Sequence, residues 1–122
     1  MTNQNQQLEV AIQEIFNELG ITRKYRGYCP LMDMVKLYVE NEQYQMNLSQ
    51  YIYPVLCAKY GKSKNTIIRR IGYLLNQKWY HAPSYVQWNF LYGYGKLIDS
   101  YSITIGQFLD IMQWNLERDG VL

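Results

Sequence analysis

A run of basic and amide side chains between residues 62 and 76 offers the plainest chemistry in this sequence. Arginine can form a bidentate pair with guanine O6 and N7, asparagine can do the same with adenine N6 and N7, and threonine offers a hydroxyl or a methyl. At about 100° per residue, the polar members of this run fall on one face of a single helix. The candidate DNA-binding residues on or beside this face are Lys62, Lys64, Asn65, Thr66, Arg69, Arg70, Tyr73 and Asn76.

These candidates divide by the part of a duplex that each would contact. Arg69 is the strongest candidate for a base contact, because it lies in the first half of the expected helix, at the centre of the polar face. Asn65 and Thr66 lie at the helix N-terminus, where a recognition helix usually meets bases. Tyr73 would add a phosphate contact. The cations expected to contact phosphates, helped by the N-terminal helix dipole, are Lys62, Lys64 and Arg70.

Basic charge is concentrated in the middle of the chain. The net charge of the whole chain is only +2, but residues 43–98 contain seven Lys or Arg and no Asp or Glu, which gives that segment +7. Such a block between acidic flanks is typical of surfaces that bind phosphate backbones, although a solvated basic face explains the charge equally well. For each candidate residue, the alternative to a DNA contact is an ordinary exposed position on an amphipathic helix. For Arg70 and Lys78 the two interpretations are evenly matched.

Two helices joined by a tight turn are expected to position this face. The first covers roughly residues 48–60, with Asn47 as its cap and a bend at Pro54. A turn at Gly61 follows, and Ser63 can cap the second helix, which runs to the break at residues 81–83. This is the layout of a helix-turn-helix, whose second helix lies in the major groove while the first braces it. The inward arc of the second helix is expected to contain Ile67, Ile71, Leu74, Leu75 and Lys78, with Ile68 and Trp79 on its rim.

Other helices are expected on both sides of this unit. Apolar residues at helical spacing predict a helix from residue 7 to Gly20, preceded by frayed residues 1–5. A second helix begins at Cys29-Pro30 and fades between residues 40 and 45. Its expected buried stripe is Leu31, Met34, Val35, Tyr38 and Val39. The many apolar residues between 85 and 92 predict a short helix there. Thr104 with Gln107 forms a capping box for a final helix. The inward residues of that final helix are expected to be Phe108, Ile111, Met112 and Leu116.

The loop between the first two helices is also basic. It carries Arg23, Lys24 and Arg26 and ends at Gly27. These cations could contact a phosphate or stay solvated, and the solvated interpretation is slightly favoured.

The chain is therefore expected to form one all-α domain, residues 1–122, with about six helices around one core and a central helix-turn-helix. Its length is that of one domain, and 48% of the residues are apolar. No membrane span or signal peptide is expected, because there is no long apolar run and no basic-then-apolar N-terminus. The expected location is the cytoplasm, in association with the nucleoid. Cys29 and Cys57 are expected to be buried thiols rather than a disulfide.

Enzyme chemistry finds little support. His81 is the only histidine, and neither cysteine lies near it in sequence. No cluster of His, Cys, Asp and Glu has the spacing of a metal site, and the run Gly93-Tyr-Gly95 is a turn rather than a phosphate loop. Neither catalysis nor a metal or other cofactor is expected.

Several segments resemble a known family. They are Glu18-Leu-Gly-Ile21, Arg26-Gly-Tyr28, the stretch Ile52-Tyr-Pro-Val-Leu-Cys-Ala-Lys-Tyr60, then Arg69, Ile71 and Trp79, and finally Thr104-Ile-Gly-Gln-Phe-Leu-Asp-Ile-Met112. Together they resemble the C-terminal effector domain of the stage-zero sporulation response regulator of endospore-forming Firmicutes. The resemblance implies a six-helix DNA-binding fold and a transcriptional regulator of double-stranded DNA.

Two departures from the family qualify this resemblance. The family carries an acid and an arginine side by side on the recognition helix and another arginine three residues on, where this chain has Ile68, Arg69 and Gly72. Only Arg69 matches, so the family's target sequence does not transfer. The family domain also follows a receiver domain, which is not present here, so the chain is either a stand-alone relative, such as one from a mobile element, or an isolated domain.

The partners expected from these observations are of two kinds. Double-stranded DNA, read in the major groove, is the first, and a homodimer on DNA is one expected arrangement because helix-turn-helix proteins commonly bind as pairs. The alternative is a protein-interaction module, an antagonist or adaptor of a host regulator. Its motivation is the missing arginine, Ile68 on the rim of the polar face, and the many tyrosines, since aromatic-rich surfaces favour protein partners. Exposure of Tyr85, Trp88 and Tyr92 would support that alternative.

Overall fold

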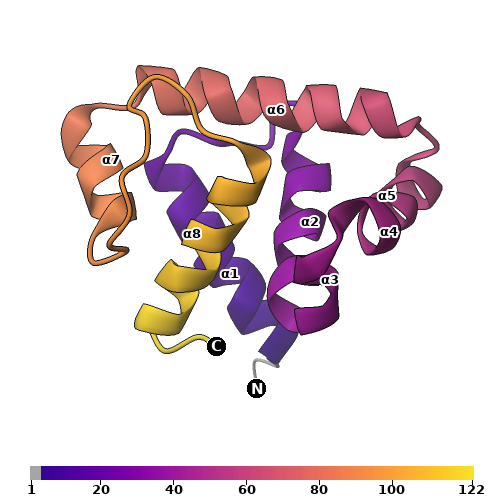
Figure 1. Cartoon of the computed structure of the whole chain (residues 1–122), viewed down its shortest axis with the longest axis horizontal. Coiled ribbons are helices and arrows are strands. Elements are labelled where there is room, and N and C mark those ends of the chain that lie inside the picture. Colours follow the sequence, from indigo (N-terminus) through magenta and orange to yellow (C-terminus); the bar gives the residue numbers. More distant parts are fainter. Residues whose placement is uncertain (1–3) are drawn as a thin grey trace.

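Helices form every regular element of the described chain, which runs from residue 4 to residue 122 in the computed structural model. No strand occurs within that range, so the expected all-α class is confirmed. In chain order the helices are α1 (Gln4–Glu18), α2 (Tyr28–Glu40), α3 (Glu42–Met46), α4 (Leu48–Tyr51), α5 (Tyr53–Tyr60), α6 (Lys64–His81), α7 (Ser84–Leu91) and α8 (Ile105–Arg118) (Figure 1).

Helix α2 lies at the centre of the molecule. It contacts α1, α3, α5, α6 and α8. The sequence explains this position, because apolar residues recur around most of the helix surface. Those that are buried are Tyr28, Pro30, Leu31, Met32, Met34, Val35 and Tyr38. The predicted stripe is confirmed except at Val39, which is only partly buried.

A chain of aromatic rings joins the helices around α2. Phe16 of α1 lies 5.8 Å from the ring of Tyr28 and 6.0 Å from that of Phe108 on α8. Phe108 stacks on Phe90 of α7 at 5.5 Å, and Phe90 meets Trp79 of α6 edge-on at 5.9 Å. Aromatic pairs at these separations add about 0.5–1.5 kcal/mol beyond the area that they bury. This core therefore fixes α6 relative to the bundle.

The helix boundaries refine the expectations in three places. The short helix α3 forms where the sequence predicted a fading helix. The expected helix over residues 48–60 is divided at Ile52, which lies between α4 and α5. The break is slight, because Ile52 keeps right-handed helical angles, φ −96° and ψ −50°, and its N–H still donates to the Leu48 carbonyl. Pro54 then lies in the first turn of α5, where its missing N–H costs no hydrogen bond. Of residues 1–5, which were expected to fray, Gln4 and Asn5 belong to α1, and residues 1–3 lie outside the described range.

The expectation of buried thiols is wrong for Cys29 and only partly met for Cys57. Both are free, but Cys29 is exposed and Cys57 is partly exposed. Cys29 shares its helix face with Asp33, four residues on, and Glu40, a further seven residues on, and that face points away from the core. Its apolar sequence neighbours are buried because they lie on the other side of α2.

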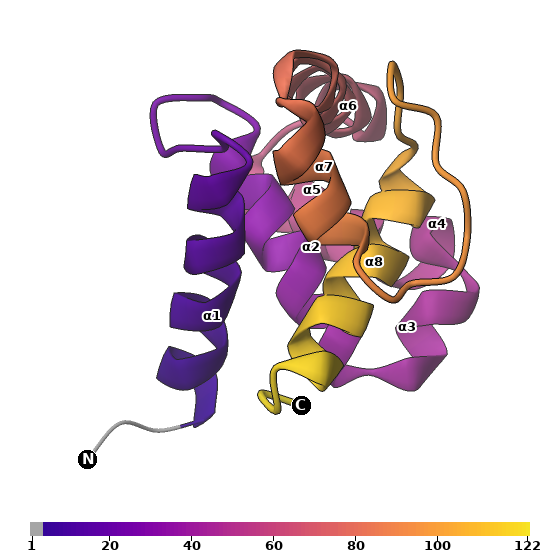
Figure 2. The same ribbon diagram turned by 90° about the vertical axis from the view of Figure 1, so that its left-hand side faces the viewer.

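Helix α6 lies across one side of the bundle and forms an outer surface of the molecule. In Figure 1 it runs along the top, roughly perpendicular to α1, α2 and α8, while both ends of the chain lie at the bottom. Figure 2 shows α6 end-on, with the loop between α1 and α2 on one side and the loop between α7 and α8 on the other. The polar face of α6 is thus bordered by two loops.

Candidate nucleic-acid interface

The turn between α5 and α6 is built by two residues that the sequence identified. Gly61 adopts a left-handed conformation, φ 61° and ψ 35°, and its N–H donates to the Cys57 carbonyl. The Ser63 hydroxyl then caps α6 by accepting from the Thr66 backbone N–H at 3.2 Å. Glycine adopts positive φ without steric cost, and serine at the cap satisfies a donor that a helix N-terminus leaves open. The predicted turn and cap are confirmed.

Helix α6 separates apolar and polar side chains onto opposite faces. The buried side is Ile67, Ile71, Leu74, Leu75 and Trp79. Four of these residues were predicted to face inward. Trp79, expected on the rim, is buried because its indole N–H donates to the Asp99 carbonyl at 2.7 Å under the loop between α7 and α8. Lys78, expected on the inward arc, is only partly buried and places its ammonium 4.4 Å from the Tyr25 ring centroid.

All of the candidate DNA-binding residues lie at the surface of α6 or of the turn before it. Those that are exposed are Lys62, Lys64, Asn65, Arg69, Tyr73 and Asn76, and those that are partly exposed are Thr66 and Arg70. Among the described residues, no ion pair includes a cation of this surface. The positive charges are therefore available to an external anion.

Some of the candidates also make contacts within the protein. Lys64 donates to the Ser49 hydroxyl at 2.9 Å, and the Thr66 hydroxyl accepts from Ser63 at 3.0 Å. Asn76 uses its amide on both sides, donating to the Gly72 carbonyl at 3.0 Å and accepting from the Ile103 N–H at 3.1 Å. Asn76 thus ties α6 to the loop before α8. A base contact by Asn76 would have to break these bonds, whereas Arg69 is unencumbered.

The loop between α1 and α2 adds cations that the sequence did not place beside α6. A hollow of about 460 Å³ separates this loop from the helix, and its lining residues are Lys24, Tyr25, Arg26, Gly27, Arg69, Arg70, Tyr73 and Leu74. Close approach at Gly27 holds the loop against the helix, since a Cβ there would lie only 2.6 Å from the Arg70 carbonyl oxygen. In the sequence, the only sign of this close approach is the glycine that follows three loop cations. That glycine does not indicate which helix the loop approaches.

Tyr25, in the same loop, lies beside two lysines. Lys78 and Lys24 lie 4.4 Å and 5.3 Å from its ring centroid. Hydrogen bonding to Lys78 lowers the pKa of the Tyr25 hydroxyl, and the charges of Lys24 and Lys78 act in the same direction. The two lysines thus favour the ionised form of Tyr25 relative to an isolated tyrosine.

Lys59 belongs to a different part of the surface. Its ammonium pairs with Asp33 at 2.8 Å, and the Tyr60 hydroxyl donates to the same carboxylate. Burial and the hydrogen bond to Asp33 raise the pKa of Tyr60. Lys59 thus braces α5 against α2 and is not one of the open cations.

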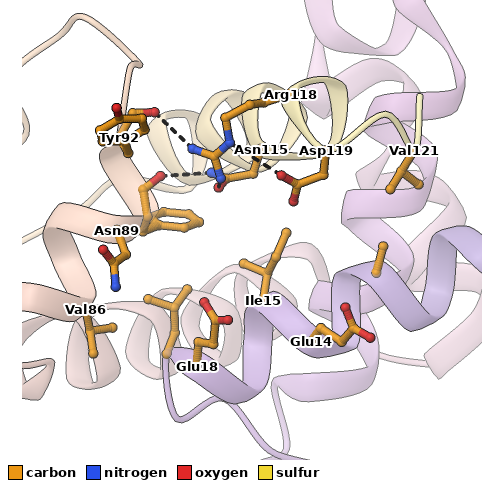
Figure 3. A pocket seen from close by; sticks show the side chains of 13 residues that line it. Glu14, Ile15, Glu18, Val86, Asn89, Tyr92, Asn115, Arg118, Asp119 and Val121 are labelled. Atoms are coloured by element: carbon orange, nitrogen blue, oxygen red, sulfur yellow. Dashed lines mark hydrogen bonds and ion pairs between the residues drawn. The ribbon is translucent and has the colours of Figure 1, made fainter.

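A second hollow, of about 620 Å³, lies among α1, α7 and α8 (Figure 3). Glu14, Glu18 and Asp119 line it, and its one cation, Arg118, is already engaged by the Tyr92 carbonyl at 3.0 Å and the Asn115 amide oxygen at 2.6 Å. Acidic walls repel phosphate. This hollow is therefore no candidate for nucleic acid, and the acidic and basic sides of the molecule are separate.

Helix α7 presents large aromatic side chains to solvent. The exposed fractions are 69% for Tyr85, 74% for Trp88 and 72% for Tyr92. An apolar-lined groove of about 660 Å³ runs between this helix and residues 93–100. The exposure of these three residues, expected for a surface that binds a protein partner, is thus present.

Among the described residues, no helix is long and apolar enough to cross a membrane. No group of three or more His, Cys, Asp or Glu in the same residues is placed to hold a metal ion.

Comparison with known proteins gives one family. Residues 12–113 match the family described as sporulation initiation factor Spo0A C terminal. The match includes α2 to α7, the C-terminal part of α1 and most of α8. No curated protein matches the chain.

Proposed function

This chain belongs to the family of the sporulation initiation factor Spo0A C-terminal domain, and on that basis we propose that it is a DNA-binding regulator that reads a duplex through α6. The observation that carries the proposal is the outer face of α6, which is polar, basic and open to solvent across one side of the bundle. In the proposed complex, α5, the turn at Gly61 and α6 act as a helix-turn-helix, and α6 enters the major groove.

Arg69 is the proposed base-reading residue. It is exposed at the middle of the polar face, and no hydrogen bond or ion pair with another described residue competes with a base. Its guanidinium can pair with guanine O6 and N7. Asn65 and Thr66 are proposed to contact bases at the first turn of α6. Phosphate contacts are assigned to Lys62, Lys64, Arg70 and Tyr73.

The function class follows from the family. Membership of a family of DNA-binding regulatory domains favours regulation over catalysis. A DNA-binding regulator acts in the cytoplasm at the nucleoid. Two copies side by side on a duplex is the arrangement that we propose for the complex, since helix-turn-helix domains commonly bind paired half-sites.

Binding to genomic duplex fragments at two salt concentrations tests the proposal. Affinity should fall steeply as salt rises, because phosphate contacts release condensed counterions. Replacing Arg69 by alanine should cost about 1–3 kcal/mol on the preferred site and relax specificity, while Lys64→Ala should weaken all duplexes alike. No binding at low salt would refute DNA binding. Equal losses from the two variants on every duplex would remove Arg69 as the base reader.

A protein-interaction module is the second candidate. The exposed Tyr85, Trp88 and Tyr92 on α7 favour it, because aromatic side chains of this size are enriched at protein interfaces. Capture from a nuclease-treated host lysate distinguishes the two candidates. A stoichiometric protein that stays bound without nucleic acid would support an antagonist or adaptor of a host regulator.

A further inference from the structure

We infer that the loop between α1 and α2 is a second DNA-contacting element, which holds a backbone phosphate of the bound duplex in the hollow that it forms with α6. This inference rests on the proposed function of α6. It assigns to Lys24 and Arg26 the phosphate contact that was one of two interpretations of the sequence, and that the family match does not give them.

The charge around the hollow selects an anion. Four cations line it, Lys24 and Arg26 from the loop and Arg69 and Arg70 from α6, and no acid lines it. Lys24, Arg26 and Arg69 are exposed and Arg70 is partly exposed. None of the four has an ion-pair partner among the described residues. Four uncompensated cations around one hollow repel one another, and a phosphate between them would relieve that repulsion.

The packing of the loop makes this a formed site rather than a chance approach of two charged segments. Gly27 is buried and lies so close to α6 that a Cβ would come within 2.6 Å of the Arg70 carbonyl oxygen and 3.3 Å of the Leu74 side chain. Tyr25, between the two loop cations, contacts Lys78 of α6. The loop is thus fixed to the helix by a glycine and by a cation–π contact, each of which also sets the position of Lys24 and Arg26.

The position of the hollow favours a DNA phosphate over a free anion. It opens along the same helix that carries Arg69, and Arg69 lines both the hollow and the polar face. A helix in a major groove has phosphate backbones along its two sides, and a loop flanking the helix lies where one of those backbones passes. Figure 2 shows the loop in this flanking position.

Arg23 provides an internal control. It belongs to the same loop, but it does not line the hollow, and its guanidinium lies over the Tyr28 ring at 5.9 Å from the centroid. Lys96, on the loop after α7, also lies outside the hollow. The double variants Lys24→Gln/Arg26→Gln and Arg23→Gln/Lys96→Gln therefore remove equal charge of the same residue types, from the hollow in one case and outside it in the other.

The test is the affinity of the full chain for its preferred duplex between about 50 and 300 mM salt, compared for the wild type and both double variants. Because the two loop cations neutralise one phosphate, their loss should reduce the slope of log K against log salt by about 0.9 and weaken binding about five-fold near 0.15 M salt, equally for preferred and unrelated duplexes. The control double variant should keep the wild-type slope. Circular dichroism melting verifies that both variants fold.

Two results would overturn the inference. One is equal slopes for the two double variants while Arg69→Ala still abolishes preference, which would leave the proposed function standing and remove the loop from it. The other is binding of inorganic pyrophosphate, measured by calorimetry, that Lys24→Gln/Arg26→Gln abolishes while DNA affinity stays at the level of the control, which would make the hollow a site for a free phosphate ligand. Failure of the wild type to bind any duplex would refute the inference together with the proposed function on which it rests.

Discussion

At the scale of single residues, two glycines of the α6 region show how differently the same residue type is used. Gly27 has no free space, because the Arg70 carbonyl oxygen occupies the direction in which a Cβ would point. Gly72, in the middle of α6, has nothing within 4 Å in that direction. No close backbone approach explains Gly72, so it only adds conformational freedom to the helix.

These surroundings predict opposite effects of the same substitution. Gly27→Ala should lower the free energy of unfolding by about 1–3 kcal/mol, since the loop must move away from α6 to relieve the overlap. Gly72→Ala should raise it by about 0.5–1 kcal/mol, because alanine restricts the unfolded chain and favours the helix. Urea denaturation of both variants measures this. A stabilised Gly27→Ala protein would show that the loop is not held against the helix.

At the scale of elements, hydrogen bonds to one carboxylate, that of Asp110, hold two helices and a loop together. Tyr38 of α2 and Tyr94 of the loop after α7 both donate to the Asp110 carboxylate of α8, at 3.2 Å and 2.8 Å. Burial raises the pKa of both hydroxyls to about 12, and the hydrogen bonds to Asp110 and its charge act in the same direction. This carboxylate therefore links three elements that are far apart in sequence.

Stability should fall at high pH because of this link. Between about pH 10 and pH 12 the two tyrosines ionise in the unfolded chain but stay protonated in the folded one. The unfolded state then binds fewer protons, so the free energy of unfolding decreases as pH rises through this window. Tyr94→Phe should show a shallower decrease than the wild type in denaturation at pH 9 and pH 11. A decrease as steep as that of the wild type would argue against the Tyr94–Asp110 bond.

The cap of α6 is a second feature of this scale. Ser63 accepts from the Thr66 N–H and is the predicted N-terminal cap of this helix. Ser63→Ala should lower the free energy of unfolding by about 0.5–2 kcal/mol, because a backbone donor at the helix N-terminus loses its partner. Ser84→Ala is the matched control, since Ser84 begins α7 but the residue before it, Pro83, offers no side-chain cap. Thermal denaturation that gives equal losses for both would contradict the cap.

At the scale of the whole molecule, the basic surface lies apart from two others of different chemistry. The basic face of α6 and its loop form the first, the acid-lined hollow lies among α1, α7 and α8, and the aromatic surface of α7 adjoins that hollow at Tyr92. A small net charge therefore conceals a strong internal asymmetry. This asymmetry would orient the molecule as it approaches a duplex.

The separation of surfaces predicts that the aromatic one can be changed alone. Trp88→Ala should alter the free energy of unfolding by less than about 0.5 kcal/mol, since the side chain is 74% exposed. DNA affinity should stay within about two-fold of the wild type, while retention of any protein from a nuclease-treated lysate should drop. Loss of DNA affinity in a folded Trp88→Ala protein would show that α7 contributes to the nucleic-acid surface.

The sequence by itself determined the local features, namely the all-α class, the turn at Gly61, the caps at Ser63 and Thr104, and the polar face around Arg69. Each of these depends on residues within one or two helical turns, where periodicity and capping chemistry act directly. The burial of Trp79, the exposure of Cys29 and the engagement of Asn76 were decided by contacts between distant segments. Tertiary packing also placed Lys24 and Arg26 around the same hollow as Arg69 and Arg70, because only packing brings a loop near residue 25 against a helix near residue 70.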